Sequence, residues 1–86
     1  MENLMERVNR VNNQDSMAKF VLELATDYSA SKDSWTNNDL GSYLISLSAW
    51  IGDMDGYYKN TGQRYDENEI SWKIFADMLA AATMYE

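Results

Sequence analysis

The sequence predicts an all-α protein: one small helical bundle, residues 1–86, built from three long helices plus a short N-terminal helix. The chain has no proline and only four glycines, so nothing inside the long segments must break a helix. Apolar residues recur at i, i+3, i+4 and i+7 in several segments, which is the spacing of an amphipathic helix. Aromatic residues make up 13% of the chain, and their rings supply apolar area to a domain of marginal size.

The first half of the chain contains two predicted helices. The short N-terminal helix is followed at once by the polar stretch NNQD, and the second helix ends at the stretch SASKD. Asp15 or Ser16 is the expected N-cap of the second helix. The apolar stripes are Leu4, Val8 and Val11 in the first helix, and Met17, Phe20, Val21, Leu24, Ala25 and Tyr28 in the second.

The third predicted helix runs from the stretch SWTNNDL to the stretch KNTG. Thr36 is its expected N-cap, with Asp39 three residues later in a variant of the capping box, and Gly62 is its expected stop. At about 100° per residue one narrow stripe is predicted to face the core. That stripe comprises Leu40, Leu44, Leu47, Ile51, Met54 and Tyr58, and an aromatic flank of Tyr43, Trp50 and Tyr57 follows its edge.

The last predicted helix follows the loop TGQRYDENE, begins near Asn68 or Ser71 and continues to the last residues. Its expected inward face consists of Trp72, Phe75, Met78, Leu79, Ala82 and Tyr85. Trp35, Trp50 and Trp72 are most simply core anchors. A half-exposed tryptophan would instead indicate an interface, because large aromatic side chains concentrate in binding hot spots.

Composition argues against several classes of function. Without cysteine or histidine the chain lacks disulfides, thiolate catalysis and the commonest general base and metal ligand, so we expect no enzyme, metal or cofactor. The net charge of −7 argues against binding to nucleic acid or to anionic membranes and favours a basic partner. Neither a signal peptide nor a run of about 18 apolar residues is present in the sequence, which predicts a cytoplasmic, soluble protein.

The stretch SAWIGDMDGYYKN, residues 48–60, resembles the start of a calcium loop. An EF-hand loop needs oxygen ligands at positions 1, 3, 5 and 12 and glycine at position 6, and neither register of this stretch supplies them. In a helix, Asp53 and Asp55 point about 200° apart and cannot chelate one ion. The metal interpretation is therefore strongly disfavoured.

Small residues recur every four positions at Ser48, Gly52 and Gly56, with Ile45 and Ala49 beside them. Glycine inside a helix costs about 1 kcal/mol relative to alanine, so two glycines in one helix suggest that packing compensates. Three interpretations stay open: a contact with the N-terminal helix, which is favoured, a partner-binding groove, or simple tolerance of small residues.

Two aspartates are further candidates. Asp77 is expected on the solvated edge of the last helix, where a surface role is favoured over a catalytic one. Asp53 has no assigned role; capping a neighbouring helix and accepting a bond from a tryptophan N–H are two structural alternatives.

The last 50 or so residues resemble a family of small bacterial domains whose function is uncharacterised. The residues that carry this resemblance are Trp35, Asn37, Leu40, Tyr43, Leu44, Trp50, Asp53, Met54, Gly56, Tyr57, Ser71, Trp72, Phe75, Ala76, Asp77, Leu79, Ala81, Ala82, Tyr85 and Glu86. The resemblance implies no activity and covers the N-terminal third poorly.

The sequence leaves three hypotheses for the function. The favoured one is a small acidic protein–protein interaction module, such as an immunity protein, antitoxin or phage-type inhibitor that masks a basic partner surface. The first alternative is a self-associating helical module, and the second is a small-ligand or divalent-ion binder that uses Asp53 and neighbouring tyrosines. The interaction candidates are Trp35, Tyr43, Ile45, Trp50, Gly52, Asp53, Gly56, Tyr57 and Asp77.

Overall fold

The computed structural model describes residues 3–85, so Glu86, which contributes to the family resemblance, lies outside the described residues. The helices are α1 (Leu4–Arg7), the 3₁₀ turn η1 (Val8–Arg10), α2 (Gln14–Ser31), the 3₁₀ turn η2 (Lys32–Ser34), α3 (Leu40–Asn60) and α4 (Trp72–Ala81). The described part of the chain contains no strand. The prediction of an all-α bundle with three long helices and a short N-terminal one is confirmed.

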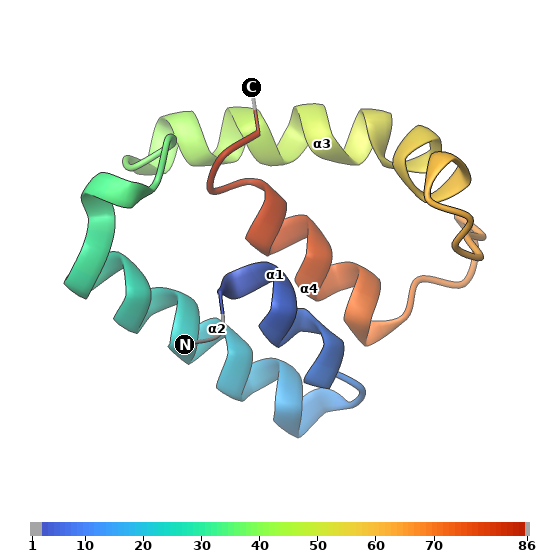
Figure 1. Cartoon of the computed structure of the whole chain (residues 1–86), viewed down its shortest axis with the longest axis horizontal. Coiled ribbons are helices and arrows are strands. Elements are labelled where there is room, and N and C mark those ends of the chain that lie inside the picture. Colours follow the sequence, from blue (N-terminus) through green and yellow to red (C-terminus); the bar gives the residue numbers. More distant parts are fainter. Residues whose placement is uncertain (1–2, 86) are drawn as a thin grey trace.

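Helix α4 is the central element of the fold. It lies between α2 and α3, which diverge from their connection at residues 32–39 (Figure 1). It packs against α1, η1, α2 and α3, whereas α2 and α3 are not among the helix pairs that pack closely on each other.

Each long helix begins after a residue whose side-chain oxygen accepts a hydrogen bond from the main-chain N–H of the third residue after it. Asn13 caps α2 in a reciprocal capping box with Ser16, so the predicted caps at Asp15 or Ser16 were wrong by two or three residues. Asp39 caps α3 by accepting from the Ser42 N–H at 2.8 Å, which corrects the predicted cap at Thr36. Ser71, one of the two predicted starting points of the last helix, caps α4.

The C-terminus of α3 is closed by the predicted glycine. Gly62 has a φ of +70°, a conformation in which other residues are strained. Its N–H donates to the Lys59 carbonyl at 3.2 Å, and the Gln63 N–H donates to the Tyr58 carbonyl at 2.9 Å. These two bonds form a Schellman motif and satisfy carbonyls that the helix end leaves unpaired.

Two clusters of buried residues form the core on either side of α4. The cluster shared by α1, η1, α2 and α4 comprises Val8, Val11, Met17, Phe20, Leu24, Ala76 and Ala80. The cluster shared by α3 and α4 comprises Trp50, Met54, Tyr58, Ile74 and Ala81. The alanines on α4 let its neighbours approach closely, which is how a helix of ten residues can organise the bundle.

The predicted core stripe of α3 was only partly correct. Met54 and Tyr58 are buried, but Leu40, Leu44 and Ile51 are exposed. The buried stripe instead follows Ser46, Trp50, Met54 and Tyr58, so Trp50 belongs to the core and not to a flank. Periodicity identified the apolar positions of α3, but the position of α4 decides which of them are covered.

In helix α4, too, the buried residues differ in part from those predicted. Trp72 and Phe75 were predicted to face inward, yet both are exposed, so Trp72 is no core anchor. Ala76 and Ala80 are fully buried in their place, and Ala82 is buried as predicted. The helix also ends at Ala81, short of the predicted end of the chain.

Asn37 fastens the start of α3 to the end of α4. Its side-chain amide donates to the carbonyls of Ala82 at 3.1 Å and Tyr85 at 2.9 Å, and its main-chain N–H donates to the Thr83 carbonyl at 2.9 Å. The buried Ser46 hydroxyl also donates to the Tyr85 carbonyl, at 2.7 Å. These bonds satisfy carbonyls beyond the last turn of α4 and fix the angle between the two helices.

Candidate functional site: an apolar groove between α2 and α3

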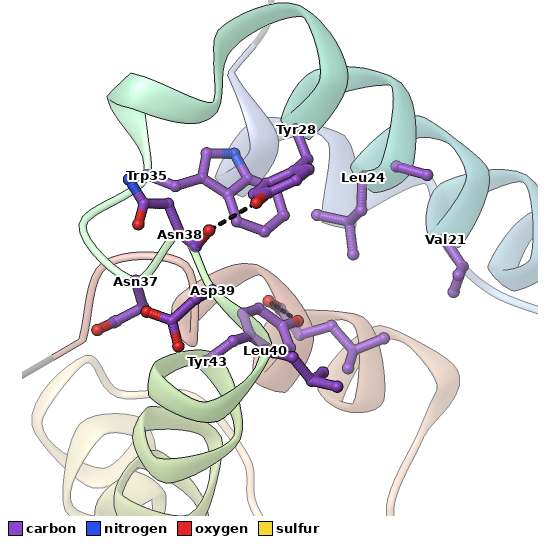
Figure 2. Close-up of a pocket in the computed structure, with 11 residues that line it drawn as sticks. Val21, Leu24, Tyr28, Trp35, Asn37, Asn38, Asp39, Leu40 and Tyr43 are labelled. Carbon is purple, nitrogen blue, oxygen red and sulfur yellow. Dashed lines mark hydrogen bonds between the residues drawn. The ribbon is translucent and has the colours of Figure 1, made fainter.

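A concavity of about 460 Å³ lies where α2 and α3 diverge (Figure 2). One wall comes from α2, the closed end from residues 35–39 and the other wall from the first turn of α3, with a contribution from α4. The lining residues are Val21, Leu24, Ala25, Tyr28, Trp35, Asn37, Asn38, Asp39, Leu40, Tyr43 and Leu79. Most of these side chains are apolar or aromatic, which is typical of a binding site.

The aromatic residues at the closed end are held rigidly. Trp35 contacts the edge of Tyr28 at a centroid distance of 5.2 Å and stacks on Tyr43 at 5.9 Å. Its indole N–H donates to Asp27 Oδ2 at 2.7 Å. The Tyr28 hydroxyl donates to the Asn38 carbonyl at 2.6 Å, as Figure 2 shows, and the Tyr43 hydroxyl donates to the Leu79 carbonyl at 2.7 Å. The polar atoms of the three rings are thus occupied by the protein itself, and the rings offer a ligand their apolar surfaces.

The one charged side chain among the residues that line the groove is acidic. Asp39 lies at the rim of the groove, and the hydrogen bonds from the Ser42 main chain and hydroxyl lower the pKa of its carboxyl group. Burial raises the pKa of Tyr43 to about 12, so this hydroxyl stays protonated at neutral pH. The segment 33–58, which includes the α3 wall, carries Asp33, Asp39, Asp53 and Asp55 and no lysine or arginine.

The apolar surface extends beyond the cavity along both neighbouring helices. On α3, Leu44 and Ile51 follow Leu40 at i+4 and i+11, which places them on the same face, and all three are exposed. On α4, Phe75 lies one turn before Leu79. The ring of Trp72 stacks on the ring of Phe75 at a centroid distance of 6.4 Å. We call the resulting surface the groove face. It consists of Val21, Leu40, Leu44, Ile51, Trp72, Phe75 and Leu79.

Only Trp35 and Tyr43 among the predicted interaction candidates line the groove. Ile45 is 73% exposed but lies about 140° around α3 from Leu40, away from the groove face. Trp50 and Tyr57 border a separate cavity of about 310 Å³, which Met5, Ala81, Met84 and Tyr85 also line. The structure therefore separates candidates that the sequence grouped together.

The small-residue strip of α3 is not covered by the N-terminal helix. A Cβ atom added at Gly52 or Gly56 would meet nothing within 4 Å. Helix α1 packs on α4 instead, so the favoured interpretation of the strip was wrong. A partner-binding role and simple tolerance of small residues stay as alternatives.

Asp77 is a structural residue. It is only 3% exposed, so its predicted place on a solvated edge was wrong and its side chain is not available to a partner. It accepts from the Tyr58 hydroxyl at 2.5 Å and pairs with Lys73 Nζ at 3.2 Å. Burial, followed by the bond to Asp77, raises the pKa of Tyr58.

Asp53 accepts a hydrogen bond from the Tyr85 hydroxyl. Its partner is thus neither of the two predicted alternatives, the N-terminus of a neighbouring helix and a tryptophan N–H. This bond is the main cause that raises the pKa of Tyr85. Within residues 3–85 no group of three or more carboxylates could hold a metal ion together.

Sequence reasoning missed most of the groove. Val21 and Leu40 had been assigned to the core, because exposed and buried apolar residues share one helical period. Asn37 was known only through the family resemblance. The signal that could have pointed to the site was the width of the apolar surface on α3, which exceeds what one short helix can cover.

The fold and the groove define a small all-α domain with an open apolar groove. The chain belongs to a family of unknown function, DUF7660, whose model matches residues 13–86. No curated protein and no solved structure shows a significant match to it. Within the described residues, no helix is long and apolar enough to cross a membrane.

Proposed function

We propose that this protein is a small acidic interaction module that binds a basic partner protein through the groove face. The observation that carries the proposal is the open apolar groove between α2 and α3 in a chain whose net charge is −7. Contiguous exposed apolar surface is characteristic of protein interaction sites. Acidic charge around it would speed association with a basic surface and disfavour acidic partners.

The residue types of the groove fit this role. Trp35, Tyr28 and Tyr43 are large, rigid side chains whose rotamers are already fixed by mutual packing and hydrogen bonds. A partner that contacts them loses little conformational freedom, which favours affinity. An immunity protein, antitoxin or phage-type inhibitor in the bacterial cytoplasm would use such a surface to mask a basic site, without any catalytic residue of its own.

Self-association is the second candidate. The open strip at Gly52 and Gly56, next to the exposed Ile45, would allow the close approach of a second helix. Two copies would bring together a charge of −7 each, which opposes a symmetric contact. Light scattering coupled to size-exclusion chromatography at millimolar and micromolar concentrations distinguishes the two candidates, because a strict monomer contradicts self-association.

A capture experiment with matched variants tests the proposed function. Leu40 and Ile45 are both 73% exposed on α3, but only Leu40 lies in the groove. Affinity capture from the source organism should yield one stoichiometric basic partner with the wild type and with Ile45→Lys, and none with Leu40→Lys. Recovery of the protein alone with all three baits would overturn the proposal.

A further inference from the structure

The groove face has the shape and chemistry of a site for one more helix. Helices α2 and α3 lie on either side of α4 without packing closely on each other (Figure 1). The side of α4 that carries Trp72 and Phe75 is exposed. Phe75 and Leu79 lie along this side. Helix α4 has ten residues, so this surface is about 15 Å long, which corresponds to about three helical turns.

The hydrogen-bonding groups of the groove favour a helical occupant over an extended one. The hydroxyl groups of Tyr28 and Tyr43 and the indole N–H of Trp35 are already bonded within the protein. An extended peptide in this apolar groove would leave its own N–H and C=O groups unpaired, which is costly. A helix satisfies these groups internally and needs only apolar side chains at its surface.

The acidic charge of the protein favours a positively charged occupant. Asp39 is the only charged residue that lines the groove, and the hydrogen bonds from Ser42 lower the pKa of its carboxyl group. The chain as a whole carries a net charge of −7. A second copy of this acidic chain is therefore disfavoured as the occupant, as is any acidic segment.

We propose that the groove face binds an amphipathic helix of the partner protein, with apolar residues at i, i+3, i+4 and i+7 and lysine or arginine beside them. This inference rests on the proposed function and specifies the partner segment. The bound helix would complete the bundle by covering α4, Leu40 and Leu44, and its cationic residues would lie toward Asp39.

Three synthetic probe peptides test this proposal. Each is about 14 residues long, enough for the three turns that the groove offers. The first contains leucine and lysine at helical spacing, the second has the same composition with strict alternation, and the third replaces lysine by glutamate in the helical pattern. Binding is measured by calorimetry at physiological salt with monomeric peptides, and methyl and amide NMR shifts locate the site.

The helical leucine–lysine peptide should bind best and shift the signals of Val21, Leu40, Leu44 and Leu79. Leu40→Lys should weaken the binding of this peptide roughly tenfold or more, because the substitution removes an apolar contact and repels the lysines of the peptide. Ile45→Lys adds the same charge outside the groove and should change the affinity less than about twofold. Both positions are solvent-exposed, so both variants should keep the wild-type unfolding temperature.

Four results would overturn the helical-partner proposal: no binding, equal weakening by both variants, equal affinity for the alternating peptide, or equal affinity for the glutamate peptide. If the peptides fail while the capture experiment yields a partner that depends on Leu40, the interaction function holds and only the helical form of the ligand is wrong. If the capture experiment yields no partner, the function itself is wrong.

Discussion

The Tyr58 hydroxyl donates a hydrogen bond of 2.5 Å to Asp77 Oδ2 across the interface of α3 and α4. Both side chains are buried, and Lys73 supplies the only other bond that Asp77 makes in the described structure. The pair therefore joins the two helices through a polar contact inside an apolar interface. Its removal leaves a buried carboxylate with a single partner.

Tyr58→Phe should lower the free energy of unfolding by about 1–3 kcal/mol, because the buried Asp77 carboxylate loses one of its two hydrogen-bond donors. Urea unfolding measured by circular dichroism checks the value. Tyr57→Phe changes the neighbouring, exposed ring and should stay within about 0.5 kcal/mol of the wild type. Equal effects of the two substitutions would mean that the bond to Asp77 contributes no stability.

Asn37→Ala should destabilise the protein by about 1–3 kcal/mol, because the carbonyls of Ala82 and Tyr85 lose their amide donor. The neighbouring Asn38 is a matched control, since it contributes a main-chain carbonyl to Tyr28 and its side chain is exposed. Asn38→Ala should therefore be nearly neutral in thermal unfolding. A neutral Asn37→Ala would show that the end of α4 is held by other contacts.

Gly52→Ala and Gly56→Ala should each stabilise the protein, by up to about 1 kcal/mol, because alanine favours the helix and its Cβ meets no neighbour in either position. Gly62→Ala should do the opposite, since its φ of +70° strains any residue with a Cβ. Differential scanning calorimetry of the three variants checks the signs. A loss of stability at Gly52 would indicate a close contact with another element.

Stability should fall as the pH rises above about 10. Burial raises the pKa of Tyr43 from 10.0 to about 12 in the folded protein. Between these values the unfolded chain has lost the tyrosine proton while the folded chain keeps it, so deprotonation favours unfolding. The stabilisation is complete below pH 10 and is lost as the pH approaches 12.

Urea midpoints at pH 8, 10 and 11 measure this dependence. Tyr43→Phe has no proton to lose and should show a shallower decline than the wild type. The pKa of Tyr58 is raised as well, so some decline should persist in the variant. Identical slopes would contradict the assignment to Tyr43.

The elements of the fold were predictable because they depend on local patterns. Gly62 and Ser71 mark helix ends by backbone chemistry that needs no tertiary contact. The groove depends on how α2, α3 and α4 are placed, and no local pattern encodes that placement. Leu40 and Met54 look equivalent in the α3 stripe, yet α4 covers Met54 and leaves Leu40 in solvent.

The buried polar contacts were unpredictable for a related reason. Asp77 lies on an apolar helix where a carboxylate suggests solvent, and only the partner Tyr58, 19 residues away in sequence, explains its burial. Trp35 and Tyr43 were identified as candidates because aromatic residues are common at interfaces, and both line the groove.

Asn37 lines the groove, and its side-chain amide also donates hydrogen bonds to the carbonyls of Ala82 and Tyr85. A ligand that binds only while these hydrogen bonds are formed adds its binding free energy to the stability of the bonded state. Occupancy of the groove is therefore coupled to a segment more than 40 residues away in the sequence. The amide protons of Thr83 and Tyr85, bonded to Ala80 and Ala81, should exchange with solvent more slowly once the groove is filled, although no ligand touches them.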